Sequence, residues 1–249
     1  MSVAGMKILI TGASSGIGAH LSRYLASQGA ELVIAARRAD ALEALAQECG
    51  AGTTAIPLDV GDADAVDAAV QEASDRMGGL TGVFNNAGTS WGGRTLEMTD
   101  DDWTRVIDIN VNGVFRVALA AAKLMVRAKT GGSIVNTASI LGIGTGSGVA
   151  AYATSKAAVV HMTRSLAQEF ARYKIRVNAI APGYFPTEMT EGFLLTEKGE
   201  QLKRNVPMRR FGELHELEGP VELLLGSKGT FITGVTLPVD GGHLTRPMS

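Results

Sequence analysis

Tyr152 and Lys156 lie four residues apart in the segment Y-A-T-S-K, which follows a glycine-rich stretch and begins a predicted helix. At this spacing the two side chains project from the same helix face, one turn apart. A phenol keeps its proton up to about pH 10, and a nearby ammonium lowers that pKa. Taken alone, such residues are more often a solvated surface pair. Their chemical interpretation is a general acid/base that works nearer neutral pH.

Ser139 ends the apolar strand that precedes this helix, and the glycine-rich loop separates it from Tyr152. A hydroxyl arriving from a strand end can hydrogen-bond the same oxygen that Tyr152 protonates or deprotonates. The segment Ser139–Lys156 is therefore a candidate acid/base site, and the elements before it must position its partners.

A second candidate site is Thr11–Gly18, T-G-A-S-S-G-I-G, between the apolar strand Lys7–Ile10 and the amphipathic helix Ala19–Gln28. Glycines let the backbone approach a phosphate closely, and a helix N-terminus attracts an anion. A strand before the motif and a helix after it are the context that a dinucleotide-binding turn requires. We therefore expect a dinucleotide here, and an ordinary tight turn is the alternative.

The end of the second predicted strand, Glu31–Ala36, indicates which dinucleotide is bound. An acid about 20 residues past the glycines would bind the 2′-hydroxyl of NAD. No acid occupies that place here, and Arg37 and Arg38 follow the strand. Guanidinium groups suit a 2′-phosphate, so the sequence favours NADP. The alternative is NAD, with both arginines in a solvated loop before the helix Asp40–Cys49.

Strands and helices alternate along the rest of the chain, which predicts a parallel sheet covered on both faces. Asp59 follows a third strand and can bind an adenine amine or cap a turn. Asp62 is expected to cap the next helix. The further predicted strands are Thr53–Leu58, Gly82–Asn85, Gly132–Ala138, Arg176–Ala181 and Gly234–Val239, and the further helices run from Asp62 to Met77, from the Tyr152 segment to about Tyr173, and over Glu216–Leu225.

Two longer segments have distinctive patterns. Thr99–Lys129 predicts one long helix capped by Thr99, and the poor helix formers Asn110, Asn112 and Gly113 predict a kink in its middle. A buried amide at such a kink needs partners, and a water held by a freed carbonyl can supply one. Pro182–Gly212 is the longest irregular stretch, which is typical of a substrate lid.

Composition excludes several classes of protein. The chain has 249 residues, 45% of them hydrophobic, and a net charge of −2, so it can bury a large core and has no basic footprint for nucleic acid. Cys49 is the only cysteine, and the four histidines lack metal-ligand spacing, so no metal site is expected. No segment approaches 18 uninterrupted apolar residues, and Met1–Gly5 lacks a leader pattern. We expect a cytoplasmic protein without a membrane partner.

Four motifs in a fixed order carry a resemblance to a known family. They are T-G-A-S-S-G-I-G at Thr11–Gly18, N-N-A-G at Asn85–Gly88, Ser139 ahead of Tyr152 in Y-A-T-S-K, and P-G-Y-F-P-T at Pro182–Thr187. Over essentially its whole length the sequence resembles the short-chain dehydrogenase/reductase family. The resemblance implies one α/β domain over residues 1–249, Rossmann-like and doubly wound, with a mostly parallel seven-stranded sheet, helices on both faces and a substrate loop at about 183–212.

The implied activity is NAD(P)-dependent hydride transfer between a ketone and a secondary alcohol. The resemblance makes Tyr152 the acid/base, Ser139 the group that orients the carbonyl, Lys156 the ribose-binding residue that lowers the Tyr152 pKa, and Asn110 the holder of the kink and of a relay water. The implied cofactor contacts are Gly12, Ser14, Ser15, Gly16, Ile17, Gly18, Arg37, Arg38, Asp59, Val60, Asn86, Ala87, Gly88, Tyr152, Lys156, Pro182, Gly183, Phe185 and Thr187. Trp91, Ile140, Leu141, Tyr184, Met189 and Phe193 are expected to form an apolar substrate pocket.

Two positions depart from the family pattern. Members that prefer NADP often carry a basic residue at the position of Ser15, so the preference for NADP depends here on Arg37 and Arg38. Phe185 replaces a smaller branched residue beside the nicotinamide carboxamide. The last part of the sequence resembles 3-oxoacyl-carrier-protein reductases, and equally sugar and cyclic-alcohol dehydrogenases that use NAD.

Three further expectations concern a carrier-protein partner, a function outside the enzyme class and the oligomeric state. Arg127, Lys129, Arg172 and Lys174 are candidates for meeting an acidic acyl carrier, although charges at helix ends are commonly only solvated. The alternative outside the enzyme class is a dinucleotide-binding sensor that lost its chemistry. The family usually forms tetramers through its two long helices, so a homotetramer is expected.

Overall fold

The computed structural model describes residues 2–188 and 190–245, and its centre is one sheet of seven parallel strands. The strands are β1 Lys7–Thr11, β2 Glu31–Ala36, β3 Thr53–Pro57, β4 Gly82–Asn85, β5 Gly132–Thr137, β6 Ile175–Pro182 and β7 Thr236–Val239. They lie in the order β3-β2-β1-β4-β5-β6-β7, and every neighbouring pair is parallel. The predicted fold class is therefore confirmed; β2 and β4 have the predicted bounds, and the other strands differ from the prediction by one or two residues at one or both ends.

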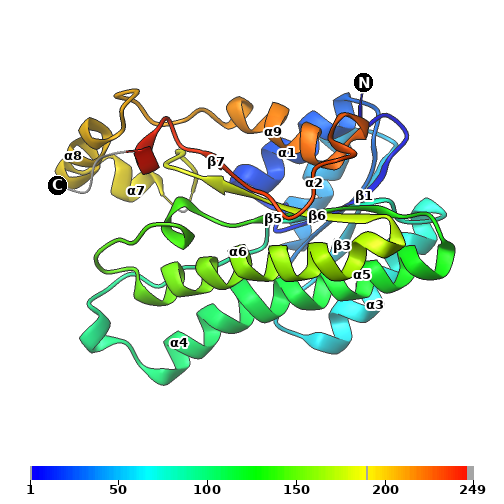
Figure 1. Ribbon diagram of the computed structural model, residues 1–249, viewed down its shortest axis with the longest axis horizontal. Coiled ribbons are helices and arrows are strands. Elements are labelled where there is room, and N and C mark those ends of the chain that lie inside the picture. Colours follow the sequence, from blue (N-terminus) through cyan, green and yellow to red (C-terminus); the bar gives the residue numbers. More distant parts are fainter. Residues whose placement is uncertain (1, 189, 246–249) are drawn as a thin grey trace.

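Helices cover both faces of this sheet (Figure 1). The helices are α1 Gly16–Ser27, α2 Ala39–Cys49, α3 Ala63–Met77, α4 Asp100–Ile107, α5 Val114–Ala128, α6 Ala150–Phe170, α7 Glu191–Leu194, α8 Glu197–Asn205 and α9 Glu218–Leu225. On one face α1, α2 and α9 bury a cluster that includes Leu21, Leu42 and Val221. On the other, α3, α5 and α6 bury a second cluster that includes Val70 and Met125.

Local capping explains where several helices begin. Asp62 accepts a hydrogen bond from the Ala65 backbone N–H at 3.0 Å, as expected for the cap of α3. Thr99 and Asp102 form a reciprocal capping box at the start of α4. Helix α1 begins at Gly16 instead of the predicted Ala19. Ser15, the residue before Gly16, has an extended backbone and takes the N-cap position. Two glycines of the motif therefore form the first turn of the helix.

The predicted long helix is interrupted as expected. Between α4 and α5 the turn Asp108–Gly113 is a π-helix, which accommodates the poor helix formers of this segment. A Cβ on Gly113 would lie 2.7 Å from Val60 Cγ2, so glycine lets the helix approach the loop after β3 closely. Asp100–Ala128 is long and apolar enough to cross a membrane by length and composition alone, but half of its most apolar window is buried inside the protein.

The stretch Pro182–Gly212 is not wholly irregular, and this part of the sequence prediction is wrong. It contains the short helix α7 and the nine-residue helix α8. Thr196 caps α8 by accepting a hydrogen bond from the Gly199 backbone N–H at 3.2 Å. Glutamates in the first turn and basic residues in the last turn favour this helix through its dipole. That charge pattern after a threonine was the sequence signal for α8.

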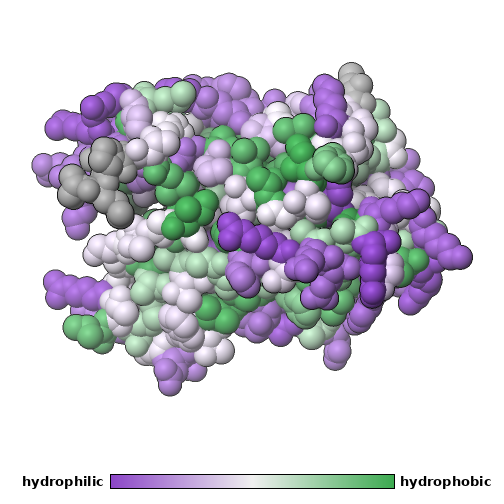
Figure 2. All heavy atoms as spheres, in the orientation of Figure 1, coloured by the Kyte–Doolittle hydropathy of each residue, from purple (hydrophilic) through white to green (hydrophobic). Residues whose placement is uncertain are grey.

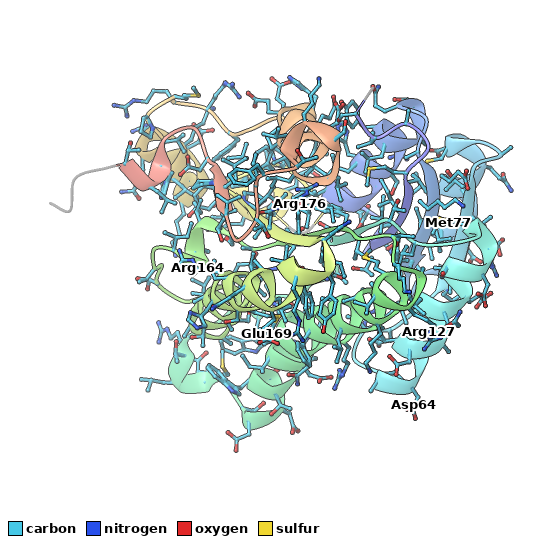
Figure 3. All side chains as sticks on the ribbon, turned by 45° about the vertical axis from the view of Figure 1, so that its right-hand side comes forward. Asp64, Met77, Arg127, Arg164, Glu169 and Arg176 are labelled. Atoms are coloured by element: carbon cyan, nitrogen blue, oxygen red, sulfur yellow. The ribbon has the colours of Figure 1, made fainter. Side chains whose placement is uncertain are left out.

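The Arg176 side chain joins β6 to the C-terminal end of α9. Its guanidinium donates hydrogen bonds to the carbonyls of Leu224 at 2.7 Å, Leu225 at 2.9 Å and Gly226 at 3.2 Å. Figure 3 shows Arg176 on the side of the sheet that α9 covers. The last carbonyls of a helix have no intrahelical partner, so this arginine satisfies them. The contact fixes the C-terminal end of α9 on the sheet.

Candidate active site

A cavity of about 400 Å³ opens where the strand order reverses, at the carboxyl ends of β1 and β4. Open parallel sheets bind ligands at this switch point. Its lining residues are Gly12, Ser14, Ser15, Gly16, Ile17, Ala36, Arg37, Arg38, Leu58, Asp59, Val60, Asn86, Ala87, Gly88, Thr89, Ile109, Thr137, Tyr152, Lys156, Thr187 and Glu188. Most of the predicted cofactor contacts therefore come together in one cavity.

The glycine-rich turn packs backbone to backbone against the turn after β4. A Cβ on Gly12, whose φ is +66°, would lie 2.7 Å from Ala87 Cα. The Thr11 hydroxyl oxygen accepts hydrogen bonds from the backbone N–H groups of Asn86 and Ala87, both at 3.2 Å. Asn86 in turn donates from Nδ2 to the Gly12 carbonyl at 3.1 Å. These contacts form a rigid cradle beside the N-terminus of α1, and its shape and donor set fit a dinucleotide pyrophosphate.

The loop after β3 forms the opposite end of the cavity. Asp59 accepts a hydrogen bond from the Gly61 backbone N–H at 2.9 Å, so its carboxylate caps a turn while it lines the cavity. Arg116 of α5 donates to the carbonyls of Val60 at 3.3 Å and Gly61 at 2.9 Å and forms an ion pair with Asp108 at 2.9 Å. No sequence pattern pointed to Arg116, because the fold brings its partners, two backbone carbonyls and the Asp108 carboxylate, into reach.

Tyr152 and Lys156 line the cavity, and Ser139, which is not among its lining residues, forms a side-chain hydrogen bond with Tyr152. The Ser139 hydroxyl oxygen accepts a hydrogen bond from the Leu141 backbone N–H at 3.1 Å, which leaves its proton free to be donated. Lys156 is 3% exposed, and its Nζ donates to the Thr137 carbonyl at 2.7 Å. The same Nζ lies 5.6 Å from the centre of the Tyr152 ring. The fold thus brings the three predicted catalytic groups together.

Burial shifts the pKa values of Lys156 and Tyr152. It lowers the pKa of Lys156 from 10.5 to about 8. Burial also raises the pKa of Tyr152 above 10, and a hydrogen bond with Ser139 opposes that rise. The expectation that Lys156 lowers the Tyr152 pKa is not met in this structure, because a dry environment disfavours the charged form of both groups. The protein alone therefore holds Tyr152 as the neutral phenol, the form that donates a proton.

Asn110 is fully buried in the π-helical turn and ties three segments together. Its Oδ1 accepts a hydrogen bond from the Thr89 backbone N–H at 2.7 Å, and its Nδ2 donates to the Thr89 carbonyl at 2.8 Å. Nδ2 also donates to the Ser155 hydroxyl on α6 at 2.9 Å. A Cβ on Gly88 would lie 3.4 Å from Asn110 Oδ1 and 3.6 Å from Lys156 Nζ. Asn110 thus positions the turn that runs past Lys156.

Four predicted cofactor contacts do not line this cavity: Gly18, Pro182, Gly183 and Phe185. Gly18 lies behind the turn, where a Cβ would be 2.3 Å from the Gly12 carbonyl oxygen. Phe185 is 4% exposed and belongs to the core cluster under α1 and α9, because it fills the space above Gly212. The Phe185 ring, which is larger than the branched side chain of the family pattern, therefore packs in the core and does not line the main cavity.

The predicted substrate pocket is not assembled as expected. None of Trp91, Ile140, Leu141, Tyr184 and Phe193 lines the main cavity, and Met189 lies outside the described residues. Ile140 is 2% exposed and belongs to the interior, whereas Phe193 on α7 is 49% exposed. Tyr184 lines a second cavity of about 340 Å³, between the end of the substrate loop and β7. The sequence identified these residues as apolar, but only their packing determines which of them face a cavity.

Six residues that line the main cavity were missing from the sequence prediction: Ala36, Leu58, Thr89, Ile109, Thr137 and Glu188. Several of them end a strand or lie directly beside a motif residue. A rule that includes the last residue of each strand at the switch point would have found Ala36 and Thr137.

We expect Gly18→Ala to weaken dinucleotide binding by at least about tenfold. The added methyl would meet the Gly12 carbonyl at 2.3 Å and Asn86 Nδ2 at 2.6 Å, so the glycine-rich turn must shift. Gly219→Ala is the matched control, since nothing lies within 4 Å of a Cβ there. Isothermal titration with NADPH and NADH checks the result, and equal affinities in Gly18→Ala and the unmodified protein would contradict it.

The chain is similar to known proteins over nearly its whole length. A family model described as enoyl-(acyl carrier protein) reductase matches residues 12–243. A 3-oxoacyl-(acyl-carrier-protein) reductase of Staphylococcus aureus is 36% identical, covering 94% of this chain and 96% of that protein. A gluconate 5-dehydrogenase of Gluconobacter oxydans is also 36% identical, covering 97% and 95%.

A solved structure is similar to the same extent. The gluconate 5-dehydrogenase of Burkholderia cenocepacia J2315, solved in complex with NADP and tartrate, is 33% identical and superposes with a TM-score of 0.94 over 99% of this chain and 98% of that one.

Proposed function

Because the chain belongs to the short-chain dehydrogenase/reductase family of oxidoreductases, we propose that it transfers a hydride between NADP(H) and a ketone or secondary alcohol, with Tyr152 as acid/base. The observation that carries this proposal is that Tyr152 and Lys156 line the same cavity as the phosphate cradle, with Ser139 hydrogen-bonded to Tyr152. A hydroxyl, a phenol and a buried ammonium at that place suit proton transfer to a carbonyl oxygen.

The protein's part in the reaction follows from the geometry. When bound, a nicotinamide dinucleotide supplies or accepts the hydride. Ser139, whose oxygen already accepts a hydrogen bond from Leu141, donates a hydrogen bond to the substrate oxygen and so orients it, while keeping its own proton. Tyr152, held as the neutral phenol, gives its proton to the same oxygen during reduction. Lys156, whose pKa of about 8 lies near neutrality, can return a proton to Tyr152.

The preference for NADP is supported by the end of β2. Arg37 and Arg38 both line the cavity there, and the residue before them is alanine in place of an acid. Within residues 2–188 and 190–245, Arg37 makes no hydrogen bond or ion pair, so its guanidinium is available to a 2′-phosphate. The other contacts that we propose are the cradle residues at Gly12 to Ile17 and at Asn86 to Gly88.

The substrate is proposed at the level of a carbonyl or secondary alcohol. One relative is named for reducing 3-oxoacyl groups on a carrier protein and another for oxidising gluconate, so thioesters and sugar acids are the two specific candidates. The second cavity gives a chemical clue, because the charged residues Arg210, Glu216 and Asp240 line it together with Tyr184. This feature favours a substrate with a polar tail over a purely apolar ketone.

A spectrophotometric panel tests the function. We expect NADPH, more than NADH, to be oxidised with at least one substrate among simple ketones, keto sugar acids and 3-oxoacyl thioesters. Turnover of acyl thioesters alone would assign the chain to the acyl-reducing candidate. Tight dinucleotide binding without any turnover in either direction would overturn the enzyme proposal and favour a dinucleotide-binding sensor.

We also propose that residues 1–249 work as one domain in a cytoplasmic homotetramer without nucleic-acid or membrane partners. Figure 2 shows hydrophobic residues gathered over β7 and α9, and β7 pairs only with β6 among the described strands. Phe231 beside this edge and Phe115 on α5 are exposed. Such surfaces suit association. Light scattering should give four times the chain mass, and a stable monomer would refute the proposal.

A further inference from the structure

An ion pair crosses the mouth of the main cavity. Arg38, at the end of β2, lies with a terminal guanidinium nitrogen 3.4 Å from the carboxylate of Glu188, in the substrate loop after β6. The two residues are 150 positions apart in the chain, and both line the cavity. The sequence offered no reason to link them. The pair therefore joins the segment after β2 to the substrate loop, beside the place where a 2′-phosphate is expected.

Arg38 is also fastened to the glycine-rich turn. Its Nε donates to the Ser14 hydroxyl at 3.2 Å, and a terminal nitrogen donates to the Ser14 carbonyl at 3.1 Å. The substrate loop lies on that turn, since a Cβ on Gly16 would lie 3.3 Å from the Thr187 side chain. Arg38 thus holds three segments, whereas Arg37 forms none of these contacts. The two neighbouring arginines are not equivalent toward an anion.

We propose that Glu188 weakens the preference for NADP by competing with the 2′-phosphate of NADP for Arg38, an inference that rests on the proposed dinucleotide-dependent function. For a 2′-phosphate to use Arg38, the guanidinium must give up Glu188. The negative charge of the Glu188 carboxylate would also repel the bound 2′-phosphate. NAD carries a hydroxyl at that position and leaves the ion pair intact. Glu188 therefore lowers the affinity for NADP relative to NAD.

The solvent exposure of Arg38 and Glu188 limits how much Glu188 can lower the affinity for NADP. The Arg38 and Glu188 side chains are 54% and 68% exposed, so solvent screens their attraction. Exposed ion pairs contribute about 0.2–1 kcal/mol, which corresponds to at most about a fivefold change in affinity. The effect should shrink as salt is added, because the Debye length falls to about 3 Å at 1 M.

The test compares two adenosine ligands that differ only in the 2′-phosphate, adenosine 2′,5′-bisphosphate and 5′-AMP. By isothermal titration at low salt, Glu188→Gln should bind the bisphosphate about three- to fivefold more tightly than the unmodified protein and 5′-AMP equally well. Glu191→Gln, an exposed glutamate three residues further along the same loop, is the matched control and should change neither affinity.

A double-mutant cycle isolates the route through Arg38. In an Arg38→Gln background, Glu188→Gln should give a smaller gain for the bisphosphate, because only the direct repulsion by the carboxylate is left to remove. An undiminished gain there, an equal change for both ligands, or no change would overturn the inference while leaving the function intact. Failure of the unmodified protein to bind NADPH, NADH or either adenosine ligand would instead overturn the proposed function, so the two failures are distinguishable.

Discussion

Tyr152→Phe is expected to lower kcat by about 10²- to 10⁴-fold, the range that a positioned acid/base contributes. The substitution removes one oxygen from a partly buried ring and leaves its packing against Lys156 in place. Dinucleotide affinity should therefore stay within about twofold, because the phosphate cradle lies on other elements. Steady-state kinetics and isothermal titration measure the two quantities separately.

Tyr173→Phe is the matched control for this change. Tyr173 is 38% exposed at the end of the same helical segment, and its ring is covered by Arg172 at 4.6 Å. Removing its hydroxyl should leave kcat unchanged. Turnover of Tyr152→Phe near that of the control would contradict the proposed role of Tyr152 as the acid/base. Loss of dinucleotide binding in Tyr152→Phe would show instead that the phenol oxygen helps to build the cofactor site.

Lys156→Met is expected to abolish turnover and yet to stabilise the cofactor-free protein at pH 7. Burial holds the Lys156 pKa at about 8 against 10.5 for an exposed lysine, which costs about 3 kcal/mol whenever the folded protein carries the ammonium. The Thr137 carbonyl loses its partner in the variant, a loss of about 1 kcal/mol. The unfolding free energy should therefore rise by about 2 kcal/mol.

The difference in unfolding free energy between the unmodified protein and Lys156→Met should depend on pH. The folded pKa lies below the unfolded one, so between about pH 8 and 10.5 the unfolded chain binds more protons than the native protein. The unmodified protein should consequently gain stability relative to Lys156→Met as the pH rises through this window. Urea unfolding at pH 7 and pH 9.5 checks the prediction, with the exposed Lys123→Met as control. A variant less stable than the unmodified protein at pH 7 would show that burial does not penalise the ammonium.

The strands, the kinked helix and the phosphate cradle could be predicted because their signals are local. A strand that ends in glycines followed by a helix needs only backbone physics to predict a tight turn with an anion site. Asn110, Asn112 and Gly113 are poor helix formers wherever they occur, so the π-helical turn at Asp108–Gly113 was predictable as a kink. The spacing of Tyr152 and Lys156 likewise places them on one helix face without knowledge of the fold.

The helix α8 was also a local feature, and its signal was overlooked. Thr196, the glutamates after it and the basic residues at its end are ordinary helix boundary signals.

Only the tertiary structure decided how these groups act on one another. Whether Phe185 faces the cavity or the core depends on the space above Gly212, and whether Lys156 lowers the pKa of Tyr152 depends on how dry the site is. The contacts of Arg38 with Glu188, Arg116 with Val60 and Asn110 with Thr89 join segments between 21 and 150 residues apart. The sequence by itself determined which chemical groups are present and on which elements; side-chain direction, burial and long-range contact decided which of them meet, because those depend on the packing of the whole chain.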